Sequence, residues 1–157
     1  MTLTRDLLDN TANLVNILNA GWTASNTDNK TPVIVRVQDI ATPLMKDLQQ
    51  ADFILIYSIG YDEEYIDLGA YNVKSEDRYS IDIRTANGQA RLRKLWKEVR
   101  RCLWAKRKNP VDDASAAFPF SFIVPLNRID LTDKSKTLFR FVYDVELRRP
   151  VEKVVTT

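Results

Sequence analysis

The stretch Tyr79-Ser80-Ile81-Asp82-Ile83-Arg84-Thr85 alternates apolar and polar side chains and is followed by the pair Asn87-Gly88. Strict alternation predicts a strand with one buried face, and Asn-Gly is typical of a turn. The chain then enters a long helical pattern over residues 91–108, apolar on one side and rich in Lys and Arg on the other. This strand, turn and helix decide the fold, because the other predicted elements can be arranged around them.

Helical and strand patterns flank this unit. Thr4 is the expected N-cap of a first helix that reaches about Ala20, with Gly21 at its end. Residues 60–77 are acidic and aromatic, and they are interpreted as an exposed connection with an extended piece near 65–68. Residues 110–117 are interpreted as a linker inside the domain. Apolar patterns predict strands at 33–37, 53–59, 78–85, 119–131 and 137–148, and a helical turn at 43–50.

These elements predict one α+β domain. A chain of 157 residues has the usual size of a single domain and is long enough to bury a core. The predicted fold is a single mixed, mainly antiparallel β-sheet packed with two principal α-helices, because a sheet covered by helices is the simplest two-layer arrangement. Residues 1–150 are expected to form this domain, and residues 151–157 a flexible C-terminal tail.

The composition argues against catalysis. The chain has no histidine and one cysteine, Cys102, which falls on the apolar side of the helix, where a thiol normally behaves as a core residue. The commonest general base and the usual zinc ligands are therefore missing. The glycines are isolated and form no phosphate-binding loop, and no apolar run is long enough to span a membrane. We expect no enzyme activity, no cofactor, no metal site and no membrane partner.

Two groups of carboxylates in the sequence are candidate cation sites. The densest acidic cluster lacks the oxygen spacing of a calcium loop, and it consists of Asp62, Glu63, Glu64 and Asp67. A nuclease-like site would need carboxylates on adjacent strands near a basic residue. The best candidates for that arrangement are Asp130, Asp144, Glu146 and Arg148. The favoured interpretations are simple solvation of the first group and cross-strand charge pairing in the second.

The helical pattern at 91–108 has nine Lys or Arg and one acid, a net charge of +8, whereas residues 1–90 carry a net charge of −6. A helical wheel gathers cations around Trp104, away from the apolar side, namely Arg93, Lys97, Arg100, Arg101 and Lys108. Three interpretations stay open. Phosphates bind the cations while a base stacks on Trp104. Alternatively, Trp104 anchors a protein interface with an arginine rim. In the third, the helix end bends under the C-terminal hairpin, which hides Trp104 and leaves the cations solvated.

The acidic residues of 60–77 favour the protein interface. A subunit with one positive face and a separate negative segment can associate head to tail, and such a contact closes into a ring if the rotation permits. Charge complementarity would set the orientation of the subunits more than their affinity. The predicted positive face contains Arg93, Lys97, Arg100, Arg101 and Trp104. The predicted negative face contains Asp62, Glu63, Glu64 and Asp67.

The order of elements resembles the tail-terminator, or tail-completion, proteins of tailed phages and tailed archaeal viruses. The likeness is carried by the opening Leu7-Leu8-Asp9 helix, the strand from Tyr79 to Thr85, the helix segment Leu92-Arg93-Lys94-Leu95-Trp96 and the hairpin 120–131 with 139–147. It is a likeness of pattern over nearly the whole chain, so no functional residue is carried over from the family. Neck and head-completion proteins of similar size share these features. The resemblance implies a hexameric ring that caps the tail tube, stops its polymerisation and joins it to the head connector.

The sequence therefore predicts a structural virion protein that forms a ring at the tail end or neck of a tailed virus. The expected partners are further copies of the chain, in a hexamer, together with tail-tube and head-connector proteins. The expected location is the virion, after assembly in the host cytoplasm. The alternative is a small nucleic-acid-binding module that uses the basic helix 91–108.

Overall fold

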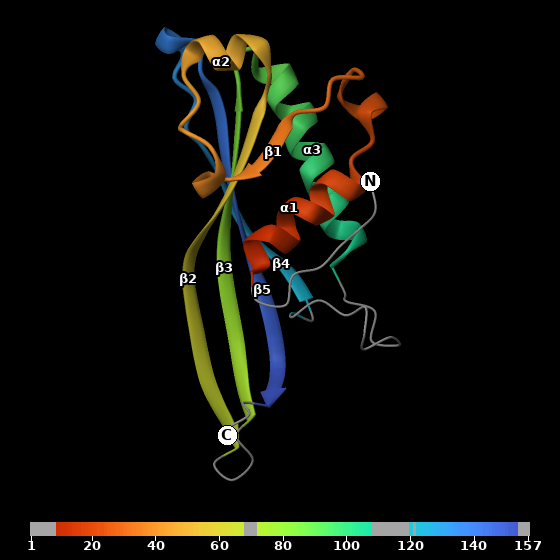
Figure 1. Ribbon diagram of the computed structural model, residues 1–157, viewed down its shortest axis with the longest axis vertical. Coiled ribbons are helices and arrows are strands. Elements are labelled where there is room, and N and C mark those ends of the chain that lie inside the picture. Colours follow the sequence, from red (N-terminus) through yellow and green to blue (C-terminus); the bar gives the residue numbers. More distant parts are fainter. Residues whose placement is uncertain (1–8, 68–71, 108–119, 121, 154–157) are drawn as a thin grey trace.

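One mixed sheet organises the chain, with its strands in the order β1-β2-β3-β5-β4 (Figure 1). A computed structural model describes residues 9–67, 72–107, 120 and 122–153. Its strands are β1 (Val33–Arg36), β2 (Phe53–Asp67), β3 (Asn72–Thr85), β4 (Phe122–Asp130) and β5 (Phe139–Lys153). Its helices are α1 (Asn10–Gly21), α2 (Met45–Gln50) and α3 (Gln89–Ala105), joined by short 3-10 turns at Ala24–Thr27, Val37–Asp39 and Lys134–Lys136.

The strand pairing confirms the predicted fold class. β1 lies parallel to β2, whereas β2 with β3, β3 with β5 and β4 with β5 are antiparallel. The central strand β3 is the alternating stretch that the sequence singles out, and its Ile81 faces Ile56 of β2 and Tyr143 of β5. The protein is therefore α+β, with one mixed, mainly antiparallel sheet and two principal helices, α1 and α3.

The main core lies between the sheet and the two long helices, which cover one of its faces (Figure 1). Alternation along the strands brings buried apolar side chains to this face, among them Ile54, Ile56, Ile81, Ile83, Phe141 and Val145. The helices meet them with Leu14, Ile17 and Leu18 from α1, and with Leu92, Leu95, Val99, Cys102 and Leu103 from α3. The apolar stripe predicted for the basic helix is thus the surface that docks α3 on the sheet.

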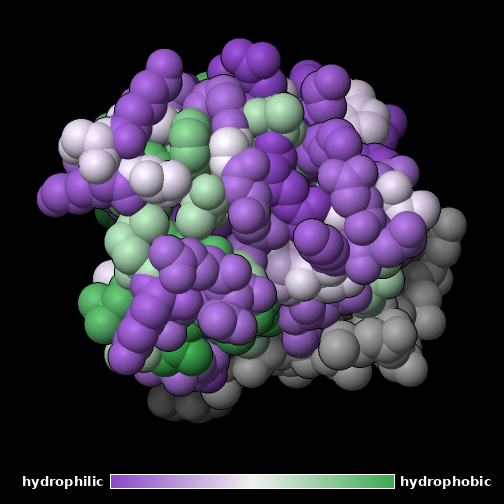
Figure 2. Space-filling view, turned by 90° about the horizontal axis from the view of Figure 1, so that it is seen from above, coloured by the Kyte–Doolittle hydropathy of each residue, from purple (hydrophilic) through white to green (hydrophobic). Residues whose placement is uncertain are grey.

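The opposite face of the sheet is more polar. Asp82 is 1% exposed and accepts hydrogen bonds from Arg140 Nε at 2.9 Å and from Arg84 Nη2 at 2.9 Å. A buried carboxylate needs such partners, because an unpaired charge in the interior is strongly destabilising. Seen from the end that carries α2, the molecular surface is mainly hydrophilic, with a small hydrophobic patch to one side (Figure 2).

The interpretation of residues 60–77 as an exposed connection is wrong. β2 continues through Asp67 and β3 starts at Asn72, and the two strands pair through this region, for example Tyr61 with Asp77. We call residues 60–67, 72–78 and 146–153 the arm; Figure 1 shows that it projects beyond the helices. Charged side chains hold its strands together, as Arg78 contacts Asp62 at 2.7 Å and Glu146 at 3.2 Å. Because the arm extends beyond the helices, with α1 reaching only its base where Asn10 contacts Asp77, its sequence lacks the apolar alternation that marks a strand.

The chain ends also differ from the prediction. α1 begins at Asn10 rather than near Thr4, because Asp9 is its N-cap and accepts a hydrogen bond from the Thr11 amide at 2.9 Å. The helix ends at Gly21, as predicted. β5 runs on to Lys153, beyond the strand end predicted at 148. Leu7 and Leu8, the linker 110–117 and residues 154–157 lie outside the described residues.

Candidate functional site

The candidate site is built on α3, whose start is fixed by its backbone. Gly88 has φ 98° and ψ 169°, a conformation open almost only to glycine, and it caps the first turn of the helix. The Asn87 amide donates to Thr85 Oγ1 at 3.0 Å, which holds the turn against the end of β3. The apolar side of α3 is then committed to the core, so its cations are left on the other sides of the helix.

Three cations of α3 are bound within the subunit. Arg91 is 8% exposed and pairs with the buried Asp52 at 2.8 Å. Lys94 pairs with Asp28 at 2.9 Å on the surface. Arg101 pairs with Glu98, three residues earlier on the helix. These charges hold the loop after α1 and the start of β2 against α3, so they belong to the fold.

Arg101 of the predicted positive face is exposed, but its charge is engaged within the subunit. Its Nη2 also donates to the carbonyl of Gly21 at 2.6 Å, which satisfies the last turn of α1, and to Thr23 Oγ1 at 3.2 Å. Glu98, 3% exposed, accepts from Asn26 Nδ2 at 2.7 Å as well. Burial acts to raise the pKa of Glu98, but the hydrogen bonds from Arg101, Asn26 and the Thr23 amide bring this pKa below its ordinary value.

The remaining cations of α3 form a stripe with Trp104. Arg93, Lys97, Arg100 and Trp104, followed by Arg107 just after the helix, are spaced by four, three, four and three residues, and this spacing puts them on one side of a helix. All five are exposed, and within the described part of the chain none of the four cations pairs with a carboxylate. We call these five residues the basic stripe. Lys108, which the helical wheel also placed here, lies outside the described residues.

Trp104 is 60% exposed, so the interpretation that the hairpin hides it is wrong. The guanidinium of Arg107 lies 4.4 Å from the centre of the indole ring, and Arg107 Nη1 donates to the Trp104 carbonyl at 3.0 Å. This cation–π contact keeps an apolar ring and a positive charge side by side on the surface. Sequence analysis missed Arg107 as part of the face, although its spacing of three residues from Trp104 would have indicated it.

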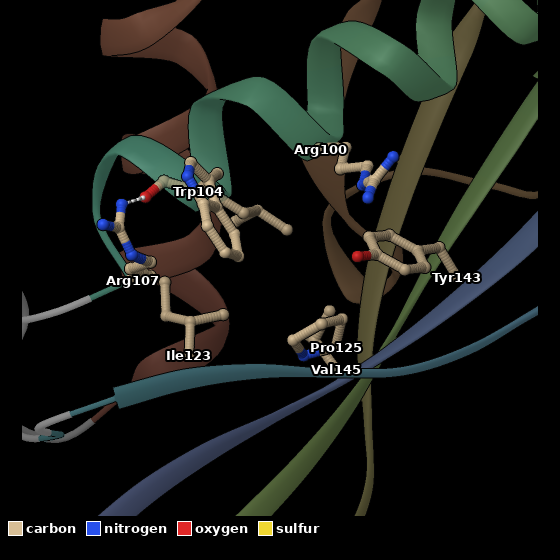
Figure 3. A pocket seen from close by; sticks show the side chains of 8 residues that line it. Arg100, Trp104, Arg107, Ile123, Pro125, Tyr143 and Val145 are labelled. Carbon is tan, nitrogen blue, oxygen red and sulfur yellow. Dashed lines mark hydrogen bonds between the residues drawn. The ribbon is translucent and has the colours of Figure 1, made fainter.

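A pocket opens beside Trp104, between the end of α3 and the strands β4 and β5 (Figure 3). It is a small hollow with about 40 Å³ of internal space, and it is lined by Arg100, Leu103, Trp104, Arg107, Ile123, Pro125, Tyr143 and Val145. Its walls are mostly apolar, and its two cations are members of the basic stripe. The Ile123 amide donates to the Arg107 carbonyl at 2.9 Å, which ties β4 to the end of the helix and shapes this side of the pocket.

The predicted negative residues lie in the arm, on β2. We call Asp62, Glu63, Glu64 and Asp67 the acidic segment. Asp62, whose side chain is 62% exposed, pairs with Arg78, and Glu63 accepts from the Tyr61 hydroxyl at 2.5 Å. Glu64 is exposed beside Lys74, and the side chain of Asp67 lies outside the described part of the structure. Within the described residues, no strand pairs with the outer edge of β2 beyond Ile56.

The two charged surfaces are not brought together within one subunit. The acidic segment lies on β2, toward one side of the sheet, whereas the pocket at the end of the basic stripe borders β4, the strand at the other side. In Figure 1 the arm also extends away from α3. A contact between these two surfaces would therefore have to join different subunits.

The nuclease-like arrangement is not formed. Asp144 accepts from the Ser80 hydroxyl at 2.5 Å, and Glu146, 3% exposed, pairs with Arg78 and Arg148. Burial acts to raise the pKa of Glu146, but the hydrogen bonds from Arg148 and Arg78 outweigh it and lower this pKa. Asp130 caps the turn after β4 by accepting from the Thr132 amide at 2.9 Å. The pair of Glu146 with Arg78 is the cross-strand charge pairing that the sequence favoured, although Glu146 is buried and not on a solvent face.

No group of three or more His, Cys, Asp or Glu residues in the described part of the chain is arranged to hold a metal ion. Cys102 is 2% exposed, as predicted for a core thiol, and burial followed by the nearby Glu98 charge raises its pKa to about 12. None of the described helices is long and apolar enough to cross a membrane. Of the residues that the sequence singled out, the exposed groups are the basic stripe, which borders the pocket, and the acidic segment. Neither a model of a known protein family nor a curated protein sequence matches this chain.

Proposed function

We propose that this protein is a structural subunit of a tailed virus, and that it forms a ring at the tail end or neck. In this role it stops growth of the tail tube and joins the tail to the head connector, and it acts without catalysis. The ring would be a homo-oligomer, a hexamer by the family resemblance. The protein would be located in the virion, after assembly in the host cytoplasm.

The observation that carries the proposal is the separation of two complementary surfaces. The basic stripe has four cations without a carboxylate partner among the described residues. The acidic segment lies on β2, toward the edge of the sheet opposite β4. Such surfaces bring copies together in one direction, since the positive side of one subunit meets the negative side of the next. A directional contact of this kind closes into a ring when the rotation permits. Trp104, exposed and flanked by arginines, has the composition of an interface hot spot.

The first test is the mass of the protein in solution, measured by light scattering over a series of protein and salt concentrations. We expect a closed oligomer at low salt. Replacing Arg93 and Arg100 with Glu should lower its mass toward that of the monomer, whereas the same reversal at Lys134 and Lys136, exposed in the turn before β5, should not. Arg101 is left intact because it is bound to Glu98 and Gly21. Equal masses for the two variants would contradict the proposal.

A mixing experiment tests the direction of the contact. Trp104→Ala disables the basic stripe but leaves the acidic segment, and Asp62→Lys with Glu63→Lys does the reverse. Each variant alone should be monomeric. In a mixture, the intact acidic segment of the Trp104→Ala variant can bind the intact basic stripe of the other variant. One contact is then restored for each pair of subunits, so a heterodimer is expected. If two identical faces met instead, the variant that keeps this face would self-associate on its own, and mixing would give no heterodimer.

The alternative proposal is nucleic-acid binding by the basic stripe. It is favoured by Trp104, since a base can stack on an exposed indole beside cations. Fluorescence anisotropy with labelled single- and double-stranded oligonucleotides tests it. Several phosphate contacts should weaken binding by orders of magnitude between about 50 and 200 mM salt. Absence of binding at the lower salt concentration would eliminate this alternative.

A further inference from the structure

The pocket beside Trp104 is lined by a phenol hydroxyl, that of Tyr143, which faces its open space. Tyr143 is only 6% exposed, and its ring packs edge-on against Trp96, with ring centres 6.2 Å apart. Figure 3 shows its hydroxyl pointing toward the hollow between Trp104 and Pro125. Among the described residues no hydrogen-bond partner is found for this hydroxyl. Burial raises the pKa of Tyr143, so the phenol stays protonated and can donate a hydrogen bond at neutral pH.

The pocket that contains the Tyr143 hydroxyl is also lined by cations, and these indicate which chemical group would bind there. Arg100 and Arg107 line the same pocket, and neither pairs with a carboxylate in the described part of the chain. An O–H donor close to the Arg100 guanidinium, in a pocket that Arg107 also lines, is suited to a carboxylate, because charge-assisted hydrogen bonds are about twice as strong as neutral ones. The apolar walls formed by Leu103, Ile123 and Val145 also require a partner that brings apolar surface with its charge.

A segment with this chemistry is exposed on the arm of the same chain. Tyr61 and Glu63 pair with Asp77 and Ser75 of β3. Because they are two residues apart on β2, they project from the same face of the arm, about 7 Å apart along the strand. Tyr61 is 52% exposed and its hydroxyl donates to Glu63, which holds the aromatic ring and the carboxylate together. The neighbouring acids Asp62 and Glu64 face Glu76 and Lys74 and project from the other face.

We propose that the pocket is the socket for the arm of a second copy of this chain, with Glu63 binding Tyr143 and Arg100 while Tyr61 packs on Trp104. This inference rests on the proposed ring and deepens it, because it names the two surfaces that meet. The arm and the pocket lie toward opposite sides of the sheet, so each subunit offers one of each, and the contact repeats from subunit to subunit.

The test compares Glu63→Gln with Glu64→Gln, two changes that each remove one negative charge from adjacent residues on opposite faces of the arm. Association is measured by sedimentation equilibrium at about 50 mM salt. We expect Glu63→Gln to weaken association about tenfold or more, as for the loss of charged hydrogen bonds, and Glu64→Gln to have little effect. Tyr143→Phe, which removes only the hydroxyl, should weaken association by a similar factor with an unchanged urea midpoint. The double variant Glu63→Gln with Tyr143→Phe should be little worse than either single change, because the two groups share one interaction.

The outcomes separate this inference from the proposed function. If the wild-type protein assembles and the Glu63→Gln and Glu64→Gln variants assemble equally well, the socket is overturned and the ring proposal stands. If the wild-type protein is monomeric up to millimolar concentration, both are overturned. If Tyr143→Phe weakens oligonucleotide binding but leaves association unchanged, the pocket belongs to a nucleic-acid site and the inference is overturned.

Discussion

Replacing Arg91 with Met should destabilise the monomer strongly, although Arg91 belongs to the most basic segment of the chain. Its guanidinium is almost fully buried and donates to Asp52 Oδ2 at 2.9 Å, to the Thr27 carbonyl at 2.5 Å and to the Lys30 carbonyl at 2.8 Å. Asp52 is 5% exposed. After the change, its carboxylate would keep only the hydroxyl of Thr85 and the side-chain amide of Asn87.

The expected magnitude follows from the charge that is left behind. Breaking a buried ion pair from one side typically costs about 3–5 kcal/mol, because the remaining charge is uncompensated. For a chain of this length, this corresponds to a fall in Tm of roughly 6–20 °C. The matched control is Lys94→Met, three residues along α3, which breaks an ion pair whose side chains are 49% and 58% exposed. That change should cost about 1 kcal/mol or less.

Urea unfolding followed by circular dichroism gives the free energy of unfolding of both variants. A second variant, Arg91→Met with Asp52→Asn, removes the uncompensated charge while retaining an acceptor for Thr85. It should be more stable than Arg91→Met alone, although it carries one change more. Equal losses for Arg91→Met and Lys94→Met, or a double variant less stable than the single one, would refute the reasoning.

Three further predictions follow from the interior of the subunit. Gly88→Ala should lower the free energy of unfolding by about 1–3 kcal/mol, because φ at this position is 98°. Gly60→Ala should be nearly neutral, because an added methyl group there meets only Arg78 Nη1 at 3.9 Å. Equal losses in urea titrations would argue against backbone strain at Gly88. Cys102, buried with a pKa raised to about 12, should resist a thiol reagent at pH 8 in the folded protein and react at once in guanidinium; rapid reaction of the native protein would contradict its burial. Glu98 has a lowered pKa, so its contribution to stability is present above the pKa of the unfolded state, about 4.3, and is lost as the pH falls through the lower folded value. Glu98→Gln should therefore be less stable than the wild type at pH 7, with a difference that shrinks below about pH 4, and a difference independent of pH would count against the lowered pKa.

The fold class was predictable because its main elements carry regular apolar patterns. The strand around Ile81 and the stripe from Leu92 to Leu103 lie against the core, where burial imposes a period of two or of 3.6, and the turn between them is indicated by Asn87-Gly88. The arm was missed for the converse reason. Charged pairs such as Arg78 with Asp62 replace most apolar contacts between its strands, so little periodic signal is left.

The candidate site was predictable only in part. The helical wheel correctly put Arg93, Lys97, Arg100 and Trp104 on the exposed side of α3. It also put Arg101 there, which is exposed, and its spacing of three residues from Glu98 allows their ion pair, but the sequence could not show that the Gly21 carbonyl lies within its reach. The Tyr143 hydroxyl could not be identified as a binding group from the sequence. Its position on the core face of β5 predicts burial but says nothing of whether a partner is present.

The division of charge on α3 explains why net charge alone is a poor guide to an interface. Arg91, Lys94 and Arg101 are neutralised by partners inside the subunit, so half of the six cations of α3 hold the loop after α1 and the start of β2 in place. The basic stripe keeps its charge because the described structure offers it no carboxylate. Its last residues line the pocket beside Trp104. That pocket combines apolar walls, two cations and the Tyr143 hydroxyl, whereas two other pockets in the described part of the chain do not. Charge, exposed apolar surface and an unpartnered donor therefore converge at the end of α3, and this convergence is what favours a protein partner there over simple solvation.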